Sequence, residues 1–296
     1  MKQIIPFLRL MRPANLVTAV SDVWAGAAIA GYFATLNLYN VNIHPLLWLS
    51  LSTVCLYGGG VVFNDVFDLK IDRIERPERP LPAGHVSLSG AVALGACLLL
   101  IAIGAAVMVN LCSVVWALLV AVASLVYDKW GKHQVVLGPL NMGLCRGFNL
   151  LLGMSLVLQT ASPLWLTALV PVIYIAAITM ISRGEVHGGS RKVLYGAAAL
   201  YLLVIASVFS FSIAQGHQWI ALLFLAGFAA MIFPPLQKAV KYPEGPRIGK
   251  AVKAGVLALI LMNAAWVAAS GHPLWAVLTA LLLPVSLLLA RLFAVT

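Results

Sequence analysis

About ten long runs of apolar residues constrain the fold of this chain more than any other feature of its sequence. The hydrocarbon core of a bilayer is about 30 Å thick, so a helix needs about 20 apolar residues to cross it. The runs that reach or approach this length cover residues 14–35, 45–67, 86–109, 111–127, 136–158, 163–182, 193–214, 217–237, 250–270 and 273–294. Only 9% of the residues are charged, against about 25% in an average soluble domain. The sequence therefore predicts an all-α, polytopic transmembrane helical bundle.

All the basic residues except Arg146 lie in alternate connections between these runs or near the chain ends. The connections near 36–44, 159–162, 215–218 and 271–273 carry none. Because Lys and Arg are enriched in cytoplasmic loops, both chain ends and all the basic connections are predicted to face the cytoplasm. The net charge of +10 therefore reflects topology and does not indicate a nucleic acid as a partner. We expect a multi-pass protein of a bacterial inner (cell) membrane.

The first apolar run is too long for the core of a signal peptide and is followed by further runs, so we expect it to remain as a helix. We expect no separate soluble domain, and interpret residues 1–296 as a single integral-membrane domain. The cysteines lie in apolar runs without the paired spacing of metal ligands, and we interpret them as small buried hydrophobic residues. They are Cys55, Cys97, Cys112 and Cys145.

The most informative polar segment begins at the end of the second run with Asn64, Asp65, Asp68 and Asp72. At about 100° per residue, the other three lie within about 100° of Asp65 on one helix face. Carboxylates crowded at membrane depth repel one another and are poorly solvated unless a cation lies among them. Mg²⁺ prefers oxygen ligands, typically one or two carboxylates together with substrate phosphates and water. Asp65, Asp68 and Asp72 are therefore predicted magnesium ligands.

Arg76 and Arg79 follow this helix and offer guanidinium groups that bind phosphate oxygens in pairs. Pro77 is expected to end the helix. An alternative interpretation is a charged juxtamembrane helix in which acids and bases pair at helical spacing. The position of the acids directly after the apolar run 58–63 favours the magnesium interpretation. The glycines of that run favour close packing of neighbouring helices over deformation near a ligand.

The pattern Asn-Asp-x-x-Asp-x-x-x-Asp, followed by Arg-Pro-x-Arg-Pro-Leu-Pro-x-Gly at residues 76–84, resembles the first aspartate-rich motif of UbiA-type prenyltransferases. Further similar positions are Arg12-Pro13, Asn15, Tyr127, Lys129 and Lys132. The resemblance implies a UbiA-like bundle, typically of nine spans. The run at 273–294 is then a departure from the family, and we expect nine to ten spans. The resemblance also implies magnesium-dependent transfer of an isoprenoid chain from its diphosphate to an acceptor, often an aromatic one.

The second aspartate-rich motif of the family is expected after the sixth run, where residues 182–191 read SRGEVHGGSR. Glu185 is the only carboxylate there, and the segment resembles the EboC-like branch of the family. We predict Glu185 as a metal ligand and Arg183 as a catalytic cation that stabilises the departing diphosphate. His187 is a predicted catalytic residue that removes a proton near neutral pH. The alternative is that the acid and the histidine are ordinary loop residues.

Two ionisable residues, Asp22 and Arg146, lie inside predicted spans. A buried ionisable group in a bilayer is a candidate functional residue and usually has a partner. Asp22 lies two helical turns after Asn15 on the same face, which favours a shared binding site. A mutual structural pair of Asp22 with Arg146 is the alternative. Asn149, one turn after Arg146, is interpreted as a contact to a neighbouring helix.

Together these residues suggest a hypothesis for the reaction. Magnesium and cations stabilise the leaving diphosphate of an allylic prenyl donor, and aromatic faces hold the resulting allylic cation before a small-molecule acceptor traps it. The aromatic candidates are Phe67, Tyr127 and Phe148. The predicted substrate-binding residues are Asn15, Asp22, Asn64, Arg76, Arg79, Tyr127, Lys132 and Arg146.

Two other functions remain open from the sequence. An intramembrane terpene cyclase would use the same opening step and let the double bonds of the substrate capture the cation. A non-enzymatic carrier of an amphiphile also suits a bundle of ten helices, although it does not explain the aspartate-rich face. The sequence identifies neither the acceptor nor any protein partner.

Overall fold

A computed structural model of the chain describes residues 4–36, 42–159, 162–186 and 188–293, and this part of the chain is helical without β-strands. Three short 3₁₀ helices connect the longer elements at Tyr32–Thr35, Gly131–His133 and Ser162–Ala168. The α-helices are α1 (Ile4–Met11), α2 (Pro13–Ile29), α3 (His44–Glu75), α4 (Leu88–Val107), α5 (Leu111–Lys129), α6 (Leu137–Met154), α7 (Leu169–Ser182), α8 (Arg191–Ala214), α9 (Gln218–Lys241), α10 (Gly245–Ala269), α11 (Pro273–Ala280) and α12 (Leu282–Leu292).

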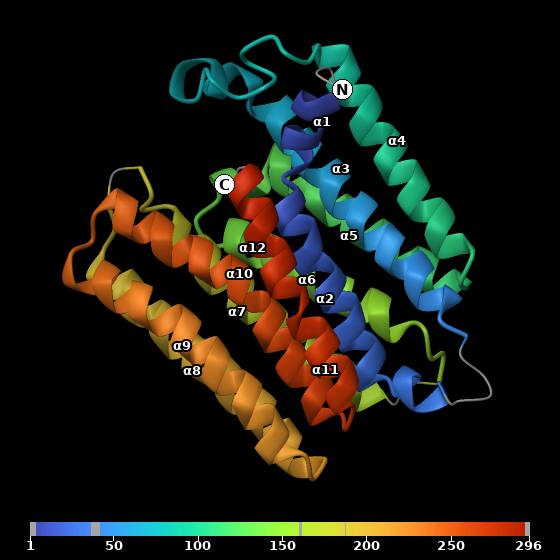
Figure 1. Cartoon of the computed structure of the whole chain (residues 1–296). Helices are drawn as coiled ribbons and strands as arrows, with labels where there is room; N and C mark the ends of the chain where they lie inside the picture. Colours follow the sequence, from blue (N-terminus) through green and yellow to red (C-terminus); the bar gives the residue numbers. More distant parts are fainter. Residues whose placement is uncertain (1–3, 37–41, 160–161, 187, 294–296) are drawn as a thin grey trace.

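Helices α2 and α6 pack side by side at the centre of the bundle (Figure 1). On one side of this pair, α3 packs with α4 and α5. On the other side lie α7, α8, α9 and α10, of which α10 contacts α2 and α7 contacts α6. Helix α12 runs along α2, where the Ser286 hydroxyl donates to the Ala14 carbonyl at 2.7 Å. The last apolar run is therefore a broken helix that packs against α2 and α10.

Eight helical segments of the described chain are long and apolar enough to cross a membrane. Each of the ten expected runs contains a helix, but the helices of two runs, α2 and α6, fall outside this set. Helix α2 has only 17 residues, and α6 carries Arg146 together with two asparagines. The prediction of nine to ten spans is therefore not confirmed. The central helices are shorter or more polar because their neighbours surround them and supply polar partners.

Close packing of α2 on α6 depends on two glycines. A Cβ atom built on Gly26 would lie 2.1 Å from the Leu150 carbonyl oxygen, and one on Gly153 would lie 2.2 Å from the Val23 carbonyl oxygen. Real Cβ atoms do not approach a backbone oxygen so closely, so only glycine fits at either position. Small residues that allow such an approach are typical of membrane helix interfaces.

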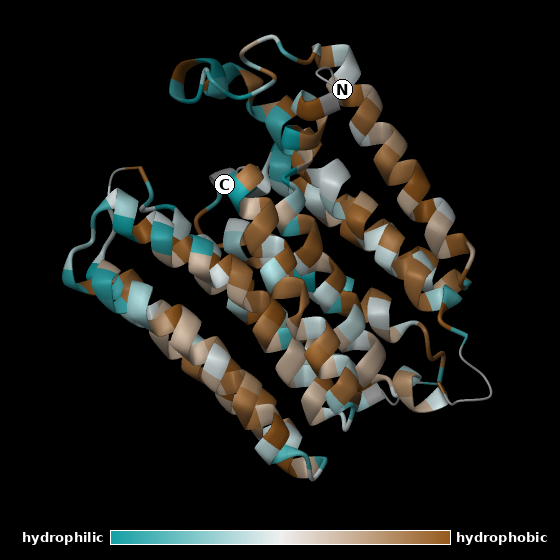
Figure 2. Ribbon diagram, in the orientation of Figure 1, coloured by the Kyte–Doolittle hydropathy of each residue, from teal (hydrophilic) through white to brown (hydrophobic). Residues whose placement is uncertain are grey.

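The two ends of the bundle differ in polarity. Figure 2 shows hydrophilic residues gathered at the end that carries both labelled termini and the loop after α3, and hydrophobic residues along the helices. The turns between α8 and α9 and between α10 and α11 lie at the opposite end and carry no Lys or Arg (Figure 1). Together with the eight apolar spans, this distribution is that of an integral, multi-pass membrane protein.

Candidate active site at the polar end of the bundle

The expected helix face of acids is present at the end of α3. The helix continues to Glu75 and ends before Pro77, as predicted. Asp65 and Asp72 are buried, and Asp68 is half-buried. Each carboxylate contacts a cation of the chain, because Arg79 reaches both Asp65 at 3.4 Å and Asp72 at 2.8 Å, and the Lys132 ammonium group pairs with Asp68.

Arg12 adds a second cation at Asp65 and contacts the same carboxylate oxygen as Arg79. Its guanidinium group donates to the Asp65 carboxylate at 2.7 Å. The residue has φ 48°, in the left-handed region, at the junction between α1 and α2. Pro13 disfavours a helical conformation in the residue before it and can begin a helix itself, which explains the break at this point. A non-glycine residue held in this region costs about 1–3 kcal/mol and is common at functional sites.

A polar vestibule of about 420 Å³ lies at this end of the bundle. We use the name vestibule for the space lined by Arg9, Arg12, Asp65, Arg76, Glu78, Arg79 and His85 among other residues. Four of these seven side chains are guanidinium groups, so the space suits a polyanion.

A second space, the cavity, lies deeper between α3, α5 and α6, and Arg12 lines both spaces. It has a volume of about 220 Å³. Its polar lining residues include Arg12, Tyr57, Asn64, Tyr127, Asp128 and Arg146, and its apolar ones include Leu56, Val61, Val120 and Met142. Predicted site residues from three helices, Asn64, Tyr127 and Arg146, are thus brought together.

Asp128 lines the cavity and was missed by the sequence analysis. The residue is buried, and one of its carboxylate oxygens accepts a hydrogen bond from the Asn64 side chain at 2.8 Å. It lies between Tyr127 and Lys129 at the end of a span, and the sequence analysis did not single it out. The orientation of α5 against α3 turns this acid inwards, and no sequence pattern indicated that orientation.

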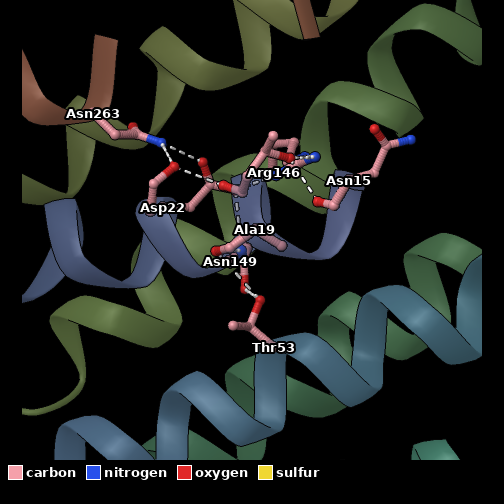
Figure 3. Close-up of polar contacts among 9 residues, drawn as sticks. Asn15, Ala19, Asp22, Thr53, Arg146, Asn149 and Asn263 are labelled. Carbon is pink, nitrogen blue, oxygen red and sulfur yellow. Dashed lines mark hydrogen bonds and ion pairs between the residues drawn. The ribbon is translucent and has the colours of Figure 1, made fainter. Parts of the chain in front are cut away.

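The buried residues Asp22 and Arg146 form an ion pair of 2.8 Å between α2 and α6 (Figure 3). The second Arg146 nitrogen donates to the Thr18 hydroxyl at 2.9 Å, and the guanidinium carbon lies 4.8 Å from the centre of the Tyr57 ring. The geometry therefore agrees with the alternative interpretation, in which Asp22 and Arg146 form a mutual pair. Arg146 lines the cavity, whereas Asp22 is not among the lining residues and is linked to it through Arg146 and Asn149.

Three further side chains complete a polar network around Asp22 (Figure 3). Asn263 of α10 donates to one Asp22 oxygen at 2.7 Å, and Asn149 donates to the other at 3.0 Å. The Thr53 hydroxyl of α3 donates to the Asn149 side-chain oxygen at 2.7 Å. The network joins α2, α3, α6 and α10 beneath the cavity and agrees with the predicted role of Asn149. Asn15 is buried on α2, one turn after Arg12, and is not among the residues that line the cavity.

The depleted second motif lies near the first one. Burial raises the pKa of the Glu185 carboxyl group, and the nearby Arg76 guanidinium group partly opposes this shift. Because Arg76 lines the vestibule, the loop after α7 lies close to that space. Arg183 is exposed and donates to the Gln134 carbonyl. His187, the predicted proton acceptor, lies outside the described residues.

The acids of α3 can supply only some of the ligands of a magnesium ion. Within the described residues, no three His, Cys, Asp or Glu side chains are grouped so that they could hold a metal ion alone. Asp65, Asp68 and Asp72 nevertheless offer hard oxygen donors beside a cationic vestibule. Mg²⁺ is usually held by one or two carboxylates and completed by substrate phosphates. The donor set therefore fits a magnesium–diphosphate complex better than a permanent metal cage.

The aromatic residues divide into two groups. Tyr127 lines the cavity as predicted, together with Tyr57, which the sequence analysis did not select. Phe67 is exposed, and Phe148 packs against Trp116. Neither of these two phenylalanines is among the residues that line the cavity, so their predicted contact with an allylic cation is not supported.

The family model of the UbiA prenyltransferase family matches residues 23–252. The chain belongs to this family. Its aspartate-rich segment and every residue that lines the cavity except Arg12 lie inside the matched range, and the predicted resemblance is confirmed. The assignment to the EboC-like branch stays a prediction.

Curated relatives of this UbiA-family prenyltransferase are named digeranylgeranylglyceryl phosphate synthase. That of Methanoculleus marisnigri is 29% identical over 248 residues, which cover 76% of this chain and 82% of the relative. That of Sulfurisphaera tokodaii is 31% identical over 175 residues, which cover 59% of this chain and 60% of the relative. The prediction of a prenyltransferase is therefore confirmed. Both relatives are archaeal, and the bacterial membrane remains an expectation.

Solved structures share the fold of this UbiA-family member. A UbiA homologue of Aeropyrum pernix K1 matches with a TM-score of 0.68 at 20% identity, covering 84% of this chain and 96% of that one. A UbiA homologue of Archaeoglobus fulgidus, bound to GPP and Mg²⁺, matches with a TM-score of 0.58 at 14% identity, covering 90% and 99%. At these identities the likeness establishes the helical fold.

Proposed function

We propose that this chain transfers a prenyl group from an allylic prenyl diphosphate to a small-molecule acceptor within the membrane, in a magnesium-dependent reaction. The observation that carries the proposal is the joining of two unlike spaces at Arg12. The vestibule is rich in guanidinium groups, which suit a diphosphate. The cavity is largely apolar and buried, which suits the reacting end of an isoprenoid. A relative of the same fold, from Archaeoglobus fulgidus, was solved with GPP and Mg²⁺.

In the proposed reaction, Arg12, Arg76 and Arg79 bind the diphosphate oxygens in the vestibule. Arg12 and Arg79 are already oriented by Asp65. Asp65, Asp68, Asp72 and Glu185 would hold magnesium, which would supply positive charge to stabilise the leaving diphosphate. Asn64 lines the cavity and directs the allylic carbon into it, and Lys132, which pairs with Asp68, adds positive charge for the diphosphate.

Inside the cavity, the rings of Tyr57 and Tyr127 face the developing allylic cation. Attraction between a desolvated cation and an aromatic face is worth about 2 kcal/mol. The charge of Arg146 is compensated by Asp22, so it does not oppose this cation as an unpaired charge would. The cavity volume of about 220 Å³ is below the range of roughly 300–1,000 Å³ for sites that enclose a whole drug-sized ligand. We therefore infer that the isoprenoid tail continues beyond the cavity towards lipid.

The proposal extends to the placement of the chain. We propose that residues 1–296 act as one integral-membrane domain whose vestibule opens to the cytoplasm, since the basic loops lie at that end.

Product analysis tests the proposed function. Membranes containing the protein are incubated with magnesium, geranyl, farnesyl or geranylgeranyl diphosphate, and one of two acceptor sources. The first source is a glyceryl phosphate that carries one geranylgeranyl chain, chosen because the relatives are named for the doubly substituted product. The second source is a total lipid extract. Diphosphate release and lipid products are followed by mass spectrometry.

The expected result is a prenyl conjugate whose formation stops in excess EDTA. Turnover that persists in excess EDTA would contradict the magnesium-dependent reaction. A cyclised hydrocarbon would indicate a terpene cyclase, an alternative that gains no support from the relatives compared. Unchanged prenyl diphosphate in every arm would refute the proposal and favour the interpretation of the protein as a carrier.

A further inference from the structure

Asp128 carries a buried carboxylate oxygen without a hydrogen-bond partner among the described residues. The residue is 4% exposed and lines the cavity. Its other oxygen accepts the hydrogen bond from Asn64, which fixes the orientation of the group. A buried, unsatisfied polar atom costs about 1–3 kcal/mol and more when charged, so its persistence calls for a ligand that donates a hydrogen bond.

The charges around the cavity leave this oxygen available. Asp128 is the only acid among the residues that line the cavity. The two cationic lining residues already have carboxylate partners, Asp65 for Arg12 and Asp22 for Arg146. An additional anion in this space would therefore meet the carboxylate of Asp128 without an uncommitted positive charge beside it. A neutral group with an O–H bond suits the position better.

We propose that Asp128 binds the nucleophilic hydroxyl group of the acceptor and takes its proton, an inference that rests on the proposed prenyl transfer. The hydroxyl oxygen forms a bond to the allylic carbon C1 of the donor. The bond between C1 and the diphosphate oxygen breaks, and its electron pair leaves with the diphosphate. The hydroxyl proton moves to the free Asp128 oxygen, so charge and atoms balance. The acceptor class is then an alcohol or phenol rather than a carboxylate or a phosphate nucleophile.

The position of Asp128 separates this role from that of the aspartates on α3. Those acids contact cations beside the vestibule, where the diphosphate is expected. Asp128 lies on α5 and faces the cavity, where the allylic carbon is expected. A base positioned for the reacting proton contributes about 10²–10⁴-fold to a rate. Loss of Asp128 should therefore reduce transfer far more than it reduces cleavage of the donor.

The test compares Asp128→Asn with the wild-type full chain and with Glu244→Gln. Asparagine keeps the shape and can still accept the Asn64 hydrogen bond, but it presents no basic oxygen. Glu244 is an exposed acid whose neighbour is Arg247 at 3.7 Å, so Glu244→Gln controls for a lost charge. Geranylgeranyl diphosphate is the donor, and the glyceryl phosphate with one geranylgeranyl chain and a total lipid extract are the acceptor sources. Diphosphate release without acceptor, conjugate formation, both KM values and the magnesium dependence are measured.

For Asp128→Asn, we expect conjugate formation to fall by about 10²-fold or more. Diphosphate release without acceptor, the donor KM and the magnesium requirement should stay within about threefold of wild type. Asp128→Glu should recover part of the lost transfer, because it restores a carboxylate displaced by one methylene group. Glu244→Gln should behave as wild type throughout.

Three results would overturn the inference. Conjugate formation that survives Asp128→Asn refutes the acceptor role alone. An equal loss of donor cleavage, with a raised magnesium requirement, assigns Asp128 to the metal–diphosphate site instead. Absence of any conjugate with the wild-type protein refutes the proposed function, and the acceptor role with it. A folding defect is recognised independently, because Asp128→Asn would then also lose cleavage while its thermal unfolding shifts.

Discussion

At the scale of single residues, the three aspartates of α3 differ in their surroundings although they share one helix face. Asp65 and Asp72 are buried and share Arg79, whereas the half-buried Asp68 pairs with Lys132. Asp72 therefore serves partly to hold Arg79. Asp65 and Asp68 lie nearer to the cavity along the helix and are better placed to share a metal with the diphosphate.

Our first prediction is that Asp68→Asn lowers diphosphate release by roughly 10²-fold or more, since electrostatic stabilisation of a leaving group has this magnitude. Asp72→Asn should have a smaller effect. Release is measured against magnesium concentration, and circular dichroism confirms that each variant remains helical. A wild-type magnesium response in Asp68→Asn would remove that residue from the metal site.

The second prediction concerns the buried pair of Asp22 and Arg146. Removing one member leaves an uncompensated charge in the centre of the bundle, which costs about 3–5 kcal/mol. Asp22→Ala should therefore lower the unfolding temperature in detergent strongly. The double variant Asp22→Ala with Arg146→Ala should be less destabilised than the sum of the single variants. Additive losses would show that the pair contributes no coupling energy.

The residue scale also shows the limits of prediction from sequence. Spacing alone placed the acids of α3 on one face, because helical periodicity is a local property. Asp128 and Asn263 could not be found in this way, since each becomes a site or network residue only through packing between distant helices. Asp128 is a single acid at the end of a span, and its spacing from other acids gives no sign of its place at the cavity.

At the scale of helices, the contact of α2 with α6 sets the geometry beneath the cavity. Gly26 and Gly153 allow the two backbones to touch, and the pair of Asp22 and Arg146 lies in the same interface. The position of Arg146 at the cavity therefore depends on this close approach.

Our third prediction is that Gly153→Ala destabilises the protein strongly, because its Cβ would lie 2.2 Å from the Val23 carbonyl oxygen. Overpacking of a tight core typically costs about 1–3 kcal/mol. The matched control is Gly104→Ala in α4, where a Cβ meets no atom within 4 Å. That variant should be neutral or slightly stabilising, since alanine favours a helix by about 0.5–1 kcal/mol over glycine. Equal unfolding temperatures for the two variants would contradict the packing argument.

The loop between α7 and α8 provides the fourth prediction. A magnesium ion held there by Glu185 alone would need diphosphate oxygens and water to complete its shell. Glu185→Gln should therefore lower the apparent magnesium affinity with diphosphate bound and reduce the maximal rate less. Arg183→Ala should reduce the rate even at saturating magnesium, because a fixed cation also stabilises the leaving group. If Glu185→Gln matches the wild type at every magnesium concentration, this loop holds no metal.

Helix positions were largely predictable, because apolar runs of fixed length report burial in lipid directly. The end of α3 at Glu75 also followed from Pro77. The central position of the shorter or more polar helices α2 and α6 was not predictable, since hydropathy does not reveal which helices lie inside a bundle. The break at Leu281 between α11 and α12 was missed as well, although Pro284 in the next turn offers a physical cause.

At the scale of the whole molecule, the polar residues of the vestibule and those of the network around Asp22 lie at different depths in the bundle. The vestibule holds charges that need water or a polyanion, and it lies at the basic end of the bundle. The network around Asp22 lies deeper, and both Asp22 oxygens accept hydrogen bonds there from side chains of α6 and α10. This division lets one end accept a charged donor while the centre stays closed to water.

The last prediction is that the vestibule faces the cytoplasm, as the one-sided distribution of Lys and Arg requires. In a background without the native cysteines, Ala83→Cys reports the loop beside the vestibule, and Gln215→Cys reports the turn between α8 and α9 at the opposite end. Both positions are exposed, and neither lines the vestibule or the cavity. A membrane-impermeant maleimide added to intact cells should label Gln215→Cys alone, and Ala83→Cys should react only after the membrane is opened. Labelling of Ala83→Cys in intact cells would show that the vestibule faces the outside of the cell. The diphosphate would then have to arrive from outside.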